Sequence, residues 1–237
     1  MKIDFFGCWF FHSPDSLRRQ LIDYKNFHSH SEIYWQNISD EINTTLHGEI
    51  SEAEDKYHES IVDAYVDQLV IAQDTAPKFH RESIFVAIMA QIEYSLVNFC
   101  SLFNQEVLQK ENNFRKLSTG NVIDCVFKYI QQDMTFDIDS MEQEVIYLKG
   151  LKLIRNSIVH HNGLITNNLD KLKAFCNEYP HFGIMNNFIY LKQSAIDETI
   201  NIGLSLVEKL EAQIQSFIPR HQQIHGIYEH QPPKPAL

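Results

Sequence analysis

The chain has 237 residues, of which 44% are hydrophobic, and its formal net charge is −11. That length and apolar content allow one large domain with a substantial core, and they exclude a wholly disordered chain. The negative charge argues against a protein that coats DNA or RNA, because affinity for a polyanion comes mainly from lysine and arginine. A small, locally basic cleft that acts on one phosphate remains compatible with this charge.

Glycine and proline are scarce, with 8 Gly and 7 Pro, which favours long helices over a many-stranded sheet. The four cysteines are scattered without a C-x-x-C pair, so we expect neither a disulfide framework nor a zinc knuckle. The apolar run Phe5–Phe11 lacks a signal-peptide cleavage site, and we find no apolar run of the ~18 residues that a spanning helix needs. We therefore expect a reduced, cytoplasmic location and no membrane partner.

Residues 1–78 are predicted to form an N-terminal helical extension of unknown role. Polar residues able to cap helices, and apolar residues at three- and four-residue steps, predict helices over 15–24, 31–46 and 51–72. The second of these is expected to end at His47-Gly48, because glycine commonly follows the last turn of a helix.

Residues 79–218 are predicted to form a helical bundle. The longest helix covers 79–110 and is apolar on several sides, as expected of a central helix, and it is followed by helices over 122–132, 140–163 and from Ser194 onward.

Between the last two helices, residues 184–191 predict a short β-hairpin with Asn186-Asn187 as its turn. Residues 219–237 are rich in proline near their end and predict a flexible tail. The predicted fold class is therefore an all-α helical bundle with a small β-hairpin.

The most informative stretch is 151–163, where Arg155, Asn156 and His160 lie near the end of a predicted helix. Arginine offers a planar, charged fork for phosphate, and histidine exchanges protons near neutral pH. Asn156 and His160 lie one turn apart, whereas Arg155 and His160 are separated by about 140° around an ideal helix. A single straight helix does not aim both at one point. Either its last turn loosens before Gly163, or a second subunit contributes its own copy.

This arrangement resembles the HEPN domain family (higher eukaryotes and prokaryotes nucleotide-binding), whose all-α bundles carry an Arg-x4-to-6-His motif. Arg155 to His160 match that motif, and the resemblance covers about residues 79–217. It implies a homodimer whose two motif helices meet at a cleft. Many members are metal-independent endoribonucleases, often toxins or anti-phage effectors, that leave a 2′,3′-cyclic phosphate. No cofactor or metal is implied.

By this resemblance, Arg155 binds and stabilises the charged phosphorane, His160 moves the proton and Asn156 has a positioning role. One group of the family is silenced by a nucleotidyltransferase antitoxin that modifies a tyrosine two places after the motif histidine. Asn162 occupies that position here, which argues against an antitoxin of that kind.

Glu93 is a further candidate, because the family often carries an acid on the preceding apolar helix. A carboxylate among apolar neighbours is costly unless a partner satisfies it, so a structural ion pair is the alternative reading. Lys152 and His161 lie beside the motif and are expected to contact RNA, although a solvated helix face explains such a lysine equally well.

The expected function is a metal-independent endoribonuclease that cleaves RNA through 2′-hydroxyl attack, as a toxin or anti-phage effector with an antitoxin or defence-system partner. The alternative is a catalytically silent HEPN module that binds nucleotide, RNA or a protein partner. Other histidines are weaker candidates. His28 and His30 have no carboxylate or third histidine at a recognisable spacing, so no metal site is expected.

Overall fold

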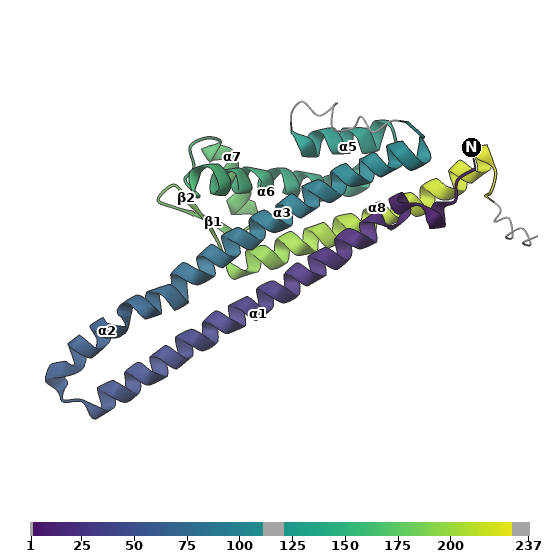
Figure 1. Ribbon diagram of the computed structural model, residues 1–237. Helices are drawn as coiled ribbons and strands as arrows, with labels where there is room; N and C mark the ends of the chain where they lie inside the picture. Colours follow the sequence, from purple (N-terminus) through teal and green to yellow (C-terminus); the bar gives the residue numbers. More distant parts are fainter. Residues whose placement is uncertain (1, 111–120, 229–237) are drawn as a thin grey trace, which may run out of the picture. The chain divides into compact units, whose positions relative to one another are not determined.

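The computed structural model describes residues 2–110 and 121–228. Within them the chain is mainly helical and carries a two-stranded antiparallel hairpin (Figure 1), which confirms the predicted all-α fold with a β-hairpin. The helices and strands, in chain order, are α1 (Trp9–Glu52), α2 (His58–Val70), α3 (Ala76–Leu102), α5 (Val122–Gln132), α6 (Glu142–His161), α7 (Leu169–Glu178), β1 (Phe182–Met185), β2 (Phe188–Leu191) and α8 (Gln193–His225).

The chain forms two compact units, and each draws on segments that are distant in sequence. The first comprises the described residues of Met1–Gln20, Gln91–Lys149 and Ile202–Leu237, and the second comprises Leu21–Ala90 and Gly150–Asn201. The predicted boundary between residues 78 and 79 falls inside the second unit. Pro77 does not end a domain there, because the helical run continues through it from the π-helical segment Ile71–Thr75 into α3.

Helix α1 is continuous where the sequence predicts two helices and a stop at Gly48. Pro14 lies inside it and cannot donate a backbone hydrogen bond to the Phe10 carbonyl. The hydroxyl of Ser13 donates to that carbonyl instead, at 2.9 Å. Ser13 therefore compensates for the proline rather than capping a new helix.

The first unit has an aromatic core around Phe10, at the start of α1. Its ring stacks on Phe99 with centroids 4.9 Å apart and meets Phe103 edge-on at 5.2 Å. The carboxylate of Glu106 accepts hydrogen bonds from the backbone N–H groups of Trp9 and Phe10, at 3.2 and 2.7 Å. This long-range cap explains why α1 begins at Trp9, since the first N–H groups of a helix have no partner within it.

Glu144 is a buried carboxylate of the first unit, at the start of α6. It accepts hydrogen bonds from the Ser205 hydroxyl and the Lys209 ammonium, both at 2.7 Å. Burial alone raises the pKa of this carboxyl, but these hydrogen bonds outweigh burial and hold the pKa below its ordinary value. The charged form is therefore the one that the fold stabilises.

We expect Glu144→Gln to lower the free energy of unfolding by about 2 kcal/mol at neutral pH, because it removes a charged hydrogen-bond acceptor. Since the folded-state pKa is lowered, this stabilisation is complete above the ordinary pKa and is lost as pH falls through the folded-state value. Urea unfolding between pH 7 and 3 measures it. Glu142→Gln, at an exposed neighbour, is the control and should change little. A Glu144→Gln deficit that stays constant with pH contradicts the prediction.

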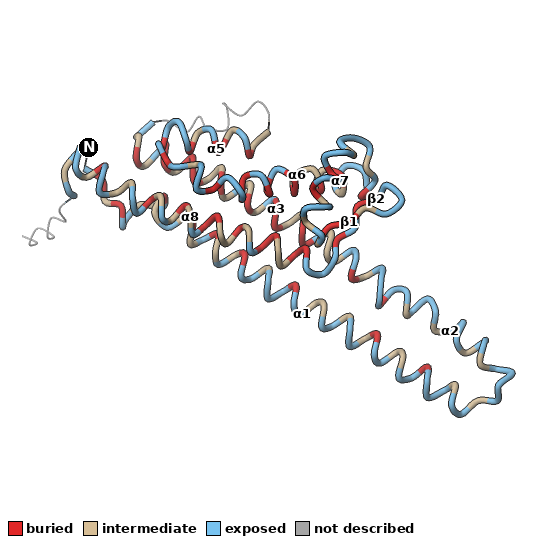
Figure 2. The backbone as a smooth tube through the Cα atoms, turned by 180° about the vertical axis from the view of Figure 1, so that it is seen from behind, coloured by how far each residue is buried: buried red, intermediate tan, exposed pale blue. Residues whose placement is uncertain are grey.

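The second unit contains a long antiparallel pair in which the later part of α1 runs beside α2 and the start of α3 (Figure 1). Hydrogen bonds join the pair from Tyr65 Oη to Glu49 Oε1 at 2.7 Å and from Gln73 Nε2 to Ser39 Oγ at 2.9 Å. Its far end, near the turn between α1 and α2, is largely exposed (Figure 2). Helix α2 begins at His58, later than the predicted start at residue 51. It is joined to α3 by a π-helical segment, Ile71–Thr75.

The β-hairpin forms in the second unit as predicted, with Met185 opposite Phe188. Asn186 and Asn187 have positive φ angles of 52° and 65°, which asparagine tolerates and which a two-residue hairpin turn with right-handed twist requires. Gly183 pairs with Tyr190, whose ring covers it; a Cβ at Gly183 would lie 2.1 Å from that ring. The strand pairing is therefore fixed by local sequence.

Helix α8 is longer than predicted, because it continues through Pro219 to His225. The predicted tail over 219–237 is therefore wrong at its beginning. Residues 229–237 of that tail lie outside the described residues.

Among the residues that the structure describes, one helical stretch, Asp55–Val107, is long and apolar enough to cross a membrane. An 18-residue window in it has a mean hydropathy of 1.4, and 44% of that window is buried. The core helix of a soluble protein passes the same test, so the cellular location stays a prediction.

Candidate functional site

The Arg155–His160 motif occupies the last turns of α6, in the second unit. Arg155 and Asn156 are half-buried, whereas His160 and His161 are exposed. The helix stays α-helical through His161, so the last turn does not loosen before Gly163. The other arrangement that would bring Arg155 and His160 to one point, a contribution from a second copy, stays a prediction.

Asn156 lies between Arg155 and His160 and contacts the arginine. Its side-chain oxygen accepts a hydrogen bond from Arg155 Nη1 at 3.2 Å, and Asn156 lies one turn before His160 on the same face. The guanidinium is therefore drawn toward the face that carries the histidine. Among the described residues no carboxylate forms an ion pair with Arg155, which leaves its other N–H groups for an anion.

The turn after the motif is fixed to the β-hairpin. Asn162 and Gly163 have positive φ angles of 51° and 82° and end α6. The Gly163 N–H donates to the Ser157 carbonyl at 3.0 Å, and the Gly163 carbonyl accepts from the Ile189 N–H at 2.9 Å. The histidine pair thus lies on a helix end held by backbone hydrogen bonds rather than on a free loop.

The hairpin presents an exposed apolar face close to this turn. Phe188 and Tyr190 lie on the same face of β2, where they pair with Met185 and Gly183 of β1. Leu164, just after the motif, forms a β-bridge with Phe188. These large apolar side chains are exposed by 37 to 65%. Exposed apolar patches of this kind often mark protein contacts.

Two of the other predicted site residues, Lys152 and His161, lie on α6 with the motif, and the third, Glu93, lies on α3. Lys152 is half-buried on α6, and the ring of exposed His161 lies 6.4 Å from that of His160. Glu93 is half-buried on α3 in the first unit, so its part in the motif's chemistry stays a prediction.

A second polar cluster in the second unit was not predicted. His28 Nδ1 lies 3.2 Å from His80 Nε2 and 3.8 Å from Glu32 Oε1. Arg81 donates two hydrogen bonds to the Glu32 carboxylate, from Nε to Oε1 at 2.7 Å and from Nη2 to Oε2 at 2.6 Å. His28 is 1% exposed, and its Nε2 lies 3.3 Å from the Gln193 carbonyl.

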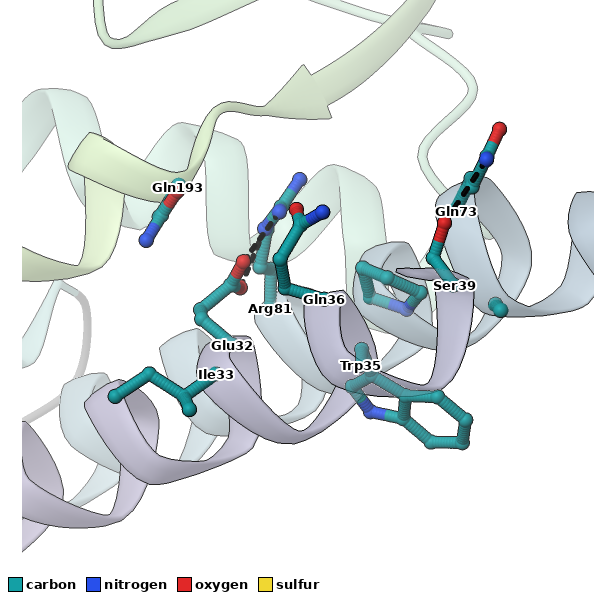
Figure 3. A pocket seen from close by; sticks show the side chains of 10 residues that line it. Glu32, Ile33, Trp35, Gln36, Ser39, Gln73, Arg81 and Gln193 are labelled. Atoms are coloured by element: carbon teal, nitrogen blue, oxygen red, sulfur yellow. Dashed lines mark hydrogen bonds and ion pairs between the residues drawn. The ribbon is translucent and has the colours of Figure 1, made fainter. Parts of the chain in front are cut away.

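A pocket of about 400 Å³ opens on the Glu32 side of this cluster. Figure 3 shows the Glu32–Arg81 pair within it and the hydrogen-bonded Ser39 and Gln73 farther along, with Gln193 opposite. Most of its polar lining is amide and hydroxyl, so a small polar molecule or water fits it better than an apolar ligand.

Both histidines of the cluster favour the neutral state. Burial lowers the pKa of His28, and nearby Glu32 opposes this only in part. Burial, followed by the proximity of His28, lowers the pKa of His80. Neutral imidazoles leave one ring nitrogen of each without a proton.

Part of this cluster could have been predicted from the sequence. His28 and Glu32 are four residues apart, which puts them on one face of a helix. We expected no metal site because we considered His28 only together with His30. His30 is exposed. His80 and Arg81 lie on α3, some fifty residues away, and no local pattern joins them to α1.

No protein-family model matches the chain, and no curated protein or solved structure matches it. The resemblance to the HEPN family therefore rests on the Arg155–His160 motif and its helical setting alone.

Proposed function

We propose that the chain is a metal-independent endoribonuclease whose active site forms where two copies of the α6 end meet. The observation that carries the proposal is the hydrogen bond from Arg155 to Asn156, which draws a guanidinium toward the face of His160. The exposure of His160 at a fixed helix end adds to it.

The reaction needs only proton transfer and charge stabilisation, because the nucleophile belongs to RNA itself. One His160 accepts the 2′-hydroxyl proton while the 2′-oxygen bonds to phosphorus. The bond from phosphorus to the 5′-oxygen breaks, and a second, protonated His160 supplies the proton to that oxygen. Arg155 stabilises the extra negative charge on the phosphorane. The products are a 2′,3′-cyclic phosphate and a 5′-hydroxyl.

A homodimer supplies this pair of histidines. Within one copy, Arg155 and His160 point about 140° apart around α6, and a two-fold axis near the helix end brings both residues from each copy to one cleft. The exposed face of Leu164, Met185, Phe188 and Tyr190 offers apolar surface for such a contact. Light scattering of the purified chain tests the dimer.

The deciding experiment incubates purified protein with total RNA in excess EDTA and maps the new ends. We expect fragments with 2′,3′-cyclic phosphate and 5′-hydroxyl ends, because internal 2′-hydroxyl attack leaves both. Intact RNA across a broad panel, or cleavage that leaves 5′-phosphates, contradicts the proposal.

The acidic charge of −11 and the exposed hairpin face favour a second function, a catalytically silent module that binds a protein partner. The two differ in cells. Growth arrest on expression, relieved by His160→Ala, supports the nuclease, whereas arrest that persists in this variant supports the binding module.

A further inference from the structure

We propose that His28, Glu32 and His80 form a binding site for a divalent transition-metal ion with the preferences of Zn²⁺. This site is separate from the proposed RNA site and goes beyond the proposed function. Two imidazoles and one carboxylate are ligands that zinc takes in proteins, with a fourth position left to water or another ligand.

The spacing of the three ligand atoms suits one ion. His28 Nδ1, His80 Nε2 and a Glu32 oxygen all lie within 4.8 Å of one another. A point equally distant from such atoms lies roughly 2 to 2.4 Å from each, against ~2.0–2.2 Å for zinc bonds to nitrogen and oxygen. Small side-chain rotations therefore complete the coordination, without movement of α1 or α3.

The environment of His28 prepares its Nδ1 for a metal. The Gln193 carbonyl accepts hydrogen bonds only, so His28 Nε2 must carry the proton. In the neutral ring, Nδ1 then presents a lone pair toward His80 and Glu32. A backbone carbonyl that fixes the far ring nitrogen of a metal-binding histidine is a frequent arrangement in metal sites.

His80 adapts without losing a proton. In the metal-free cluster its Nε2–H donates to His28 Nδ1 at 3.2 Å. With an ion between the two nitrogens, the proton of neutral His80 moves to Nδ1, and Nε2 becomes a ligand. His80 is only half-buried, so its protonated Nδ1 can donate a hydrogen bond to water.

Arg81 positions the Glu32 carboxylate and also competes with a metal ion for it. Glu32 accepts Nε–H on Oε1 and Nη2–H on Oε2, and each carboxylate oxygen has a second lone pair. Oε1 therefore bonds an ion while Oε2 stays with Arg81. The positive guanidinium weakens attraction of a cation to this site, so removal of Arg81 should strengthen binding.

The test titrates metal-freed protein with Co²⁺, which replaces Zn²⁺ and reports four-coordination through visible absorption, and then displaces Co²⁺ with Zn²⁺. We expect one ion per chain and a higher melting temperature with Zn²⁺. His80→Ala should weaken binding at least about 100-fold. Arg81→Gln should tighten it several-fold. His30→Ala, at an exposed histidine on the same helix, is the matched control and should bind as the wild type does.

Glu32→Gln provides a second variant, since the amide still accepts from Arg81 but is a poor metal ligand. Circular dichroism establishes that each variant is folded. The proposal is overturned if wild type binds no ion, if folded His80→Ala and Glu32→Gln bind as tightly as wild type, or if His30→Ala loses binding as they do.

Discussion

His160→Ala should lower RNA cleavage by about 10²–10⁴-fold, the usual contribution of general acid–base catalysis. Arg155→Ala should cost about 10²–10³-fold, as expected when one donor to a developing oxyanion is removed. The melting temperature of His160→Ala should stay within a few degrees of wild type, because His160 is exposed and the α6 end is held by backbone hydrogen bonds. Initial rates on one oligonucleotide in EDTA measure both effects.

The His160→Ala variant also tests whether the cleft is shared between copies. Re-annealing equal amounts of His160→Ala and wild-type protein makes half of the dimers mixed, with one intact His160 each. If the reaction uses His160 of both copies, random pairing leaves about a quarter of the activity of wild type at the same total concentration. An activity of about half means that each copy acts alone. His30→Ala and His161→Ala serve as controls, and the second should weaken RNA binding only severalfold.

Local rules predicted the parts of the fold whose partners lie nearby in sequence. Helix α5 has the predicted bounds of 122–132, because Asn121 caps it through its own side chain. The Asn186-Asn187 turn likewise determines the hairpin. The start of α1 was predicted at residue 15 rather than at Trp9, because the cap by Glu106 comes from almost a hundred residues away. Periodicity contains no information on such a partner.

The candidate site divides in the same way. The motif residues Arg155, Asn156 and His160 lie within six positions of one helix, so their relative directions follow from helix geometry. The contact between Arg155 and Asn156 follows because they are neighbours in sequence. The cluster around His28 depends on α3 lying against α1, which brings His80 to it. The sequence also gives no reason for a glycine at position 150, inside α6, where glycine is a poor helix former.

The structure supplies that reason and with it a sharp prediction. A Cβ at Gly150 would lie 2.1 Å from ring carbons of Phe175 on α7. Phe175 is buried and contacts the rings of Tyr179 and Phe182, with centroids 4.7 and 5.6 Å away, so its ring has little room to withdraw. Gly150→Ala should therefore lower the free energy of unfolding by about 2 kcal/mol, within the range for overpacked cores. Helix propensity alone predicts the opposite sign, a gain of up to ~1 kcal/mol.

Gly48→Ala is the matched control, because Gly48 also lies within a helix but a Cβ at that position would have nothing within 4 Å. Propensity acts alone there, so this variant should gain up to ~1 kcal/mol. Urea unfolding of the two variants side by side measures the difference. Stabilisation of both would mean that α7 does not pack against Gly150. Phe175 contacts Phe182 of the hairpin, and the hairpin holds the turn that ends the motif. RNA cleavage by Gly150→Ala should therefore also fall, whereas cleavage by Gly48→Ala should not.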